Sequence, residues 1–217
     1  VFDDAENLDH VAQHVVNAAF WNAGQNCSAT SRLIVHKAIK APLMEKIEAR
    51  LRDWKVGDPL DPNTHIGALI DAEHCKKVRS FLNKEDQGEG PYVSPVIYNV
   101  KNGDAKASDE IFGPVLSVIE VASNDEAIVV ANDTDYGLAA SVFTANTRRA
   151  IRAARDIRAG TVTVNCYGEG DIATPFGGYK QSGFGGRDNG VHAHDQFTEL
   201  KTIWIDLTDP QSGDNVR

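Results

Sequence analysis

A cysteine in a polar turn is the strongest candidate for chemistry in this sequence of 217 residues. Cys27 follows a stretch with helical periodicity and precedes a run of β-branched residues typical of a buried strand. A side chain in such a turn can face a cleft, and a backbone N–H group beside it can stabilise an oxyanion. A thiolate there is a strong nucleophile, whereas most free cysteines simply pack as small apolar side chains. Position alone leaves Cys27 open between these two interpretations.

The other two cysteines occupy different settings. Cys75 lies beside His74 on the apolar side of an expected helix, which favours a position in the core. Cys166 directly follows an expected strand, at the end where α/β proteins bind ligands, so it either lines a pocket or merely ends the strand. Three cysteines without a Cys-x-x-Cys pair argue against a disulfide framework or a zinc ribbon and favour a reducing compartment.

An acidic residue before a later strand is a second candidate. The carboxylate of Glu110 could chelate two vicinal hydroxyls, and the ring of Phe112 could press on a planar group. The alternative, an exposed loop acid beside a core phenylalanine, is favoured by these residues taken alone. The glycine-rich residues 176–186 lack both phosphate-binding fingerprints and indicate a tight loop over a site. The seven histidines form no metal-binding motif, so no metal site is expected.

The elements that must position these residues alternate in type. Apolar periodicity predicts a first helix with Asp4 as its N-cap, and a second helix that begins at about Pro42. Strands alternating with helices in the second half predict βαβ units, hence an α/β fold with a mostly parallel sheet flanked by helices. The expected strands are residues 32–36, 92–100, 115–121, 138–144, 161–164 and 200–207.

Composition excludes several function classes. The chain is 41% hydrophobic, which is enough for a real core. It carries 22 basic and 31 acidic residues, a net charge of −9, which makes nucleic acid an unexpected partner. Apolar runs are too short to span a bilayer, and no signal peptide is visible. The sequence therefore predicts a cytoplasmic protein, and its start at Val1 without a methionine predicts a fragment.

Three sequence motifs, taken together with their order and spacing, indicate a protein family. Residues 20–29 (FWNAGQNCSA), 110–115 (EIFGPV) and 175–183 (PFGGYKQSG) together resemble the NAD(P)-dependent aldehyde dehydrogenases. The likeness is collinear from residue 1 to about residue 207, and residues 170–183 look like enzymes that oxidise γ-glutamylaminobutyraldehyde or other aminoaldehydes.

The resemblance implies roles for single positions. Cys27 matches the family's nucleophile, which attacks an aldehyde to give a thiohemiacetal and then a thioester that water hydrolyses to the acid. Its backbone N–H matches one oxyanion donor. Glu110 matches the carboxylate that holds the ribose on the nicotinamide side of NAD or NADP, and Phe112 matches the ring beside it. The resemblance thus reverses the preference for an ordinary loop acid at position 110.

The resemblance also implies what residues 1–217 leave out. The cofactor-binding domain, the general base and a second oxyanion donor lie N-terminal to this segment in the family, so the isolated chain is expected to lack turnover. Residues 1–199 match the catalytic domain and residues 200–207 a strand at a subunit interface, which implies a homodimer or homotetramer. Residues 208–217 are expected to be an unstructured tail.

The resemblance also bears on the substrate and on the fate of the acyl group. Cys166, Glu169 and Asp171 lie in the stretch where the family builds its substrate entrance, and the two acids would attract a cationic aldehyde. An ordinary acidic loop on an enzyme of broad range is the alternative. Transfer of the acyl group to coenzyme A, or a domain that serves only in assembly, are the competing functions.

Overall fold

A parallel three-stranded sheet forms the larger half of the molecule. The computed structural model describes residues 1–168 and 170–207. Strands run in the order β1-β3-β2, all parallel, with β3 between the other two. All residues of β3 except Glu120 are buried, which explains its nearly continuous apolar sequence. The bounds are β1 Arg32–His36, β2 Val96–Asn99 and β3 Val115–Val121.

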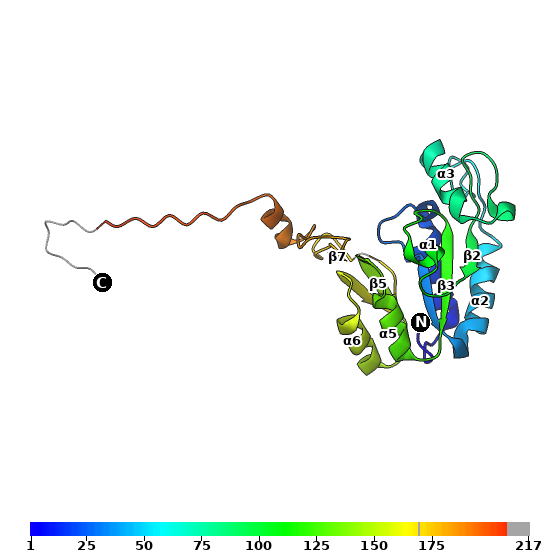
Figure 1. Ribbon diagram of the computed structural model, residues 1–217, viewed down its shortest axis with the longest axis horizontal. Helices are drawn as coiled ribbons and strands as arrows, with labels where there is room; N and C mark the ends of the chain where they lie inside the picture. The colour runs from blue at the N-terminus through cyan, green and yellow to red at the C-terminus, as the bar shows by residue number, and fades with distance from the viewer. Residues whose placement is uncertain (169, 208–217) are drawn as a thin grey trace.

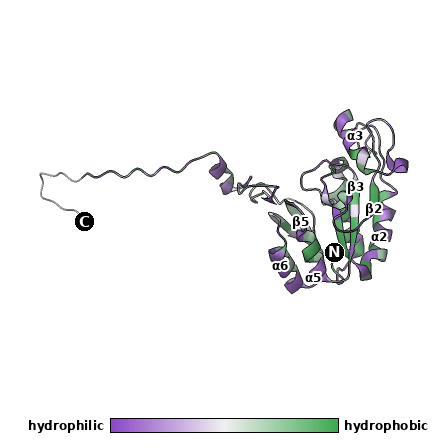
Figure 2. Cartoon of the chain, in the orientation of Figure 1, coloured by the Kyte–Doolittle hydropathy of each residue, from purple (hydrophilic) through white to green (hydrophobic). Residues whose placement is uncertain are grey.

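Helices α1, α2 and α3 accompany this sheet (Figure 1). They span Leu8–Phe20, Lys37–Leu51 and Ala72–Phe81. The apolar spacing of α1 directs Val11, Val15 and Phe20 into a core that also holds Leu43 of α2 and Leu116 of β3. Hydrophobic residues accordingly concentrate on the strands of the body, as Figure 2 shows. None of the helices in the described part is long and apolar enough to cross a membrane.

Two expected helix starts are wrong by several residues. Asn7, not Asp4, caps α1 by accepting a hydrogen bond from the backbone N–H of His10 at 3.2 Å. Asp4 instead accepts a hydrogen bond from the Thr144 hydroxyl at 2.6 Å, a distant partner that local sequence does not reveal. Similarly, α2 begins before Pro42, which lies inside the helix at the cost of one backbone donor.

A smaller half contains two more pairs of strands. The parallel pair is β5 with β6, and the antiparallel pair is β4 with β7. A second apolar cluster joins this half to β3 and α5. The bounds are β4 Tyr136–Gly137, β5 Ala139–Val142, β6 Thr161–Val164 and β7 Tyr179–Lys180, with α4 Ala105–Ser108, α5 Asn124–Asn132 and α6 Thr147–Asp156. Short 3₁₀ helices are η1 Trp21–Gly24, η2 Lys84–Asp86 and η3 Val191–Gln196. The predicted α/β class with mostly parallel strands is confirmed.

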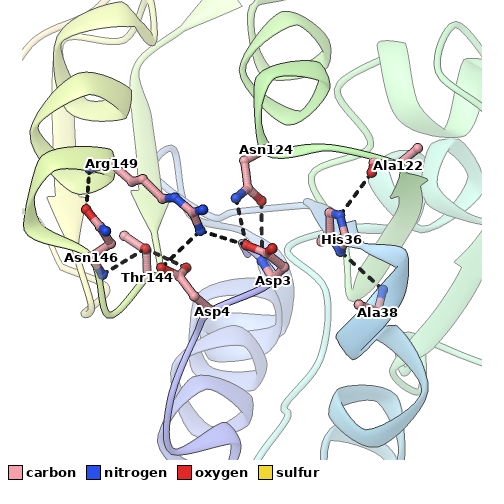
Figure 3. A network of polar contacts seen from close by, with 9 residues as sticks. All are labelled: Asp3, Asp4, His36, Ala38, Ala122, Asn124, Thr144, Asn146 and Arg149. Carbon is pink, nitrogen blue, oxygen red and sulfur yellow. Dashed lines mark hydrogen bonds and ion pairs between the residues drawn. The ribbon is translucent and has the colours of Figure 1, made fainter.

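Residues 1–4 lie between the two halves and bond to both. The backbone of Val1 pairs with β1, donating to the Ile34 carbonyl and accepting from the His36 N–H, while Phe2 donates to the Phe143 carbonyl after β5. Polar side chains extend this connection in Figure 3. There Asp3 accepts a hydrogen bond of 2.7 Å from the Asn124 side chain and forms an ion pair of 2.9 Å with Arg149. The hydrogen bond from Asn124, and to a smaller extent the charge of Arg149, lower the pKa of the Asp3 carboxyl.

The C-terminal segment, residues 197–207, extends away from residues 1–196, which are called the body below. After η3 the chain runs outward in Figure 1, and residues 200–207 have no strand pairing within the described residues. The expected strand therefore has no partner strand among residues 1–168 and 170–207. Its large apolar side chains are open to solvent, with Trp204 91% exposed. The tail predicted for residues 208–217 lies outside the described residues.

Candidate active site

A tight left-handed turn carries the candidate nucleophile. Asn22, Ala23 and Gly24 lie within η1 and have φ of 53°, 58° and 70°, so this segment is a left-handed turn and not a regular 3₁₀ helix. Only glycine adopts this conformation without steric cost, so the turn holds backbone strain next to Cys27. A Cβ on Gly24 would lie 2.1 Å from the carbonyl oxygen of Gly113. The glycine therefore lets the turn approach the loop that ends in Gly113, backbone against backbone.

Cys27 is exposed at the end of this turn. Its Sγ lies 3.8 Å from Oδ1 of Asn26, within reach of an S–H···O hydrogen bond. In the part of the chain that the structure describes, the backbone N–H of Cys27 has no hydrogen-bond acceptor. The sulfur is thus accessible, and an unused donor stands beside it.

The loop with Glu110 and Phe112 faces the same space. A cavity of about 510 Å³ is lined by Cys27, Glu110 and Phe112 together with residues of α1, β1 and β5. Glu110 is exposed, and its carboxylate has no hydrogen-bond or ion-pair partner among residues 1–168 and 170–207. An unpaired carboxylate has the acceptors that two vicinal hydroxyls need, so Glu110 could bind a diol at this wall of the cavity.

His74 supports this loop, and sequence reasoning missed it. Phe112 has φ of 60°, a left-handed conformation that is uncommon for a bulky residue. Nε2 of His74 donates a hydrogen bond of 2.7 Å to the Phe112 carbonyl oxygen, and the two rings meet edge to face at 6.2 Å. Asp71 caps α3 and thereby orients His74. Only the tertiary contact between α3 and the loop reveals this role.

Tyr167 is a second lining residue that was not expected. Its hydroxyl accepts a hydrogen bond of 2.9 Å from the Asn26 side chain, next to Cys27. The available signal was its place one residue after Cys166, just beyond the carboxyl end of a parallel strand. Cys166 itself is exposed and is not among the residues that line the cavity.

The expected acidic entrance is only partly described. Asp171 is exposed, lies outside the cavity lining, and accepts a hydrogen bond of 2.8 Å from the Ala173 backbone N–H in its own turn. Glu169 lies outside the described residues. Cys75 is buried, as expected for a core position. Among the described residues, no group of three or more His, Cys, Asp or Glu is arranged to hold a metal ion.

Comparisons with known proteins agree with the resemblance seen in the motifs. The sequence model of the aldehyde dehydrogenase family matches residues 1–203. Aminoacetaldehyde dehydrogenase of Pseudomonas aeruginosa is 56% identical over 220 residues, which cover 96% of this chain and 44% of that protein. The NADP/NAD-dependent aldehyde dehydrogenase PuuC of Escherichia coli is 41% identical over 219 residues, covering 95% and 44%.

A solved structure is similar as well. The γ-glutamyl-γ-aminobutyraldehyde dehydrogenase of Burkholderia cenocepacia superposes with a TM-score of 0.85 at 46% identity, covering 91% of this chain and 43% of that one. The chain thus spans less than half the length of the relatives it matches. The match of the family model to residues 1–203 and these identities show that the chain belongs to the aldehyde dehydrogenase family.

Proposed function

We propose that residues 1–199 are the catalytic part of an enzyme that oxidises an aldehyde to a carboxylic acid, with Cys27 as the nucleophile. The observation that carries this proposal is the cavity that the exposed Cys27 shares with Glu110 and Phe112. A structural cysteine needs neither exposure nor a neighbouring unpaired carboxylate.

In the proposed reaction, the thiol of Cys27 loses its proton to solvent, and Sγ of the thiolate forms a bond to the aldehyde carbon. The carbonyl oxygen becomes an oxyanion, which the free N–H of Cys27 can stabilise. Loss of a hydride from the same carbon leaves a thioester on the sulfur, and water then releases the acid and restores the thiol. The chain supplies the nucleophile and one oxyanion donor in this scheme.

The proposed cofactor is NAD or NADP. When bound, the nicotinamide supplies the hydride acceptor. Glu110 would hold the two hydroxyls of the adjacent ribose, and Phe112 would pack beside it, with its backbone held by the hydrogen bond from His74. The name of the Escherichia coli relative includes both nucleotides, which leaves both in the proposal.

Competition between an aldehyde and a thiol reagent tests the nucleophile on the chain itself. Iodoacetamide labelling of Cys27 is expected to slow in the presence of a reactive aldehyde, because a thiohemiacetal occupies the sulfur. The corresponding alcohol, which cannot form a thiohemiacetal, is the control and should leave the labelling rate of Cys27 unchanged. Equal rates at Cys27 with and without aldehyde would contradict its role.

Turnover tests the division of labour. Residues 1–217 with NAD and a reactive aldehyde are expected to give no reduced cofactor, whereas the longer enzyme turns over and loses at least about 10³-fold of its kcat on Cys27→Ala. Robust turnover by residues 1–217 would refute this division. Acyl-CoA formation with stimulation by coenzyme A would indicate acyl transfer in place of hydrolysis.

An aminoaldehyde is the proposed substrate class. The names of the relatives from P. aeruginosa and B. cenocepacia both specify aldehydes that carry an amino-derived group. The acidic pair Glu169 and Asp171 in this chain would attract a cationic substrate by long-range electrostatics. Asp171 and Cys166 lie outside the cavity lining, so their proposed role is to meet the substrate before it enters. In the longer enzyme, kcat/KM should be higher for aminobutyraldehyde than for butanal. Equal values that do not respond to Glu169→Gln and Asp171→Asn would contradict this assignment.

Residues 200–207 are proposed as an interface strand in a homodimer or homotetramer. The exposed Leu200 and Trp204 support this, since an apolar extended segment left in water favours association. Sedimentation of the intact protein measures the number of subunits, and a monomer at all concentrations would overturn the proposal.

A further inference from the structure

The side chain of Asn26 is held from two directions. Its amide Nδ2 donates a hydrogen bond of 3.1 Å to Oγ of Ser28 and a second of 2.9 Å to the hydroxyl of Tyr167. The two hydroxyls lie 3.4 Å apart and close a triangle. An amide nitrogen has two protons, so both are used and the plane of the amide is set. Its remaining polar atom, Oδ1, is the atom that faces Sγ of Cys27 at 3.8 Å.

Tyr167 reaches this triangle from a separately anchored loop. Its backbone N–H donates to Nδ1 of His14 in α1 at 3.1 Å. Burial and the neighbouring His10 lower the pKa of His14, in that order, which keeps this nitrogen available as an acceptor. The Asn165 side chain bonds both the N–H and the carbonyl of Thr144 at 2.9 and 3.0 Å. The backbone that carries the phenol is therefore held by α1 and by the chain after β5.

We propose that Tyr167 is a positioning residue for Cys27, acting through Asn26. The phenol holds the Asn26 amide with its oxygen toward Sγ, and that oxygen selects one rotamer of the cysteine side chain. This inference rests on the proposed role of Cys27 as nucleophile. Its chemical value is orientation, because a sulfur held in one direction approaches a carbonyl carbon along one line.

Loss of the phenol hydroxyl has a specific consequence. In Tyr167→Phe the ring remains, but Asn26 keeps only its bond to Ser28 and can rotate. In the wild type, the S–H of Cys27 must break its hydrogen bond to Oδ1 of Asn26 before the sulfur can react. In the variant this acceptor is no longer held in place, so the bond is weaker. One hydrogen bond contributes about 0.5–1 kcal/mol net, which corresponds to a roughly two- to fivefold faster reaction with a small thiol reagent.

The experiment is a double-mutant cycle on residues 1–217. The rate constant for iodoacetamide labelling of Cys27 is measured in the wild type, Tyr167→Phe, Asn26→Ala and the double variant. Each single variant should label Cys27 roughly two- to fivefold faster, and the double variant no faster than Asn26→Ala alone. Thermal unfolding reports whether each variant is folded. Tyr92→Phe, a tyrosine outside the cavity lining, is the matched control.

Two outcomes overturn the proposal. An unchanged Cys27 rate in a folded Tyr167→Phe variant would mean that the phenol does not position the sulfur. Additive effects of the two substitutions would mean that Tyr167 does not act through Asn26. Labelling needs neither cofactor nor aldehyde. The double-mutant cycle therefore tests only the role of Tyr167, whereas protection of Cys27 by an aldehyde tests only its role as nucleophile, and either result can be negative without the other.

Discussion

The body and the C-terminal segment use similar residues with opposite results. In β3 the apolar side chains are buried, and Leu116 is fully inaccessible. Between residues 197 and 207 every large apolar side chain is exposed, from 68% for Ile205 to 105% for Leu200. Both stretches are rich in β-branched and aromatic or aliphatic residues. What differs is the presence of partners, because β3 has a strand on each side and the segment has none within the described residues.

This difference separates two kinds of stability. The rest of the chain builds its sheet and its core from its own residues, and residues 1–4 bond to both halves. The segment gains nothing from its apolar residues in a single chain, so any stabilisation from them requires association. The comparison predicts that substitutions in the body will change the free energy of unfolding of the single chain, whereas substitutions in the segment will change association between chains.

The largest expected effect contrasts Leu116→Ala with Trp204→Ala. Removing a fully buried leucine should lower the free energy of unfolding by about 2–5 kcal/mol. Trp204→Ala should change it by less than about 0.5 kcal/mol, because the ring contacts mainly water. Urea unfolding of residues 1–217 at low protein concentration measures both. Comparable losses would show that the segment packs on the body.

A smaller effect is expected inside the active-site turn. Gly24→Ala should destabilise the body by about 1–3 kcal/mol more than Gly103→Ala. Both glycines have positive φ, at 70° and 90°, but only a Cβ at position 24 would meet a carbonyl oxygen, that of Gly113. The difference between the two variants in urea unfolding isolates this close approach. Equal losses would mean that the two loops can separate without cost.

The smallest effect concerns a hydrogen bond between two side chains of the body, Tyr98 and Asp86. The Tyr98 hydroxyl donates to Asp86 at 2.6 Å, and burial first and then Asp86 raise its pKa to about 12 from an ordinary value of 10. The folded state therefore disfavours ionisation, so this stabilisation is complete below pH 10 and is lost as the pH rises through about 12. Tyr98→Phe should cost about 1 kcal/mol at pH 8.

The control for Tyr98 is the pH dependence itself. The free energy of unfolding of the wild type should decrease between pH 10 and pH 11.5 by more than that of Tyr98→Phe. Parallel curves for the two proteins would show that the tyrosine does not titrate differently on folding.

Motifs predicted the family correctly and supplied the candidate site residues, while caps and supporting contacts escaped prediction. Cys27, Glu110 and Phe112 were identified because their motifs are local and their order is collinear with the family. The cap at Asn7 was missed because Asp4, the apparent cap, is drawn to Thr144 in the other half. His74 was missed because its bond to the Phe112 carbonyl leaves no trace in either local sequence.

The sequence by itself determined the α/β class, the central apolar strand and the identity of the candidate nucleophile, because these follow from short-range periodicity and from contiguous motifs. Tertiary structure alone decided that Tyr167 faces Asn26 across 141 positions of sequence, and that residues 200–207 pair with no strand in the described part of the chain. Such contacts depend on where separate elements come to rest against one another, which no local pattern of residue types specifies.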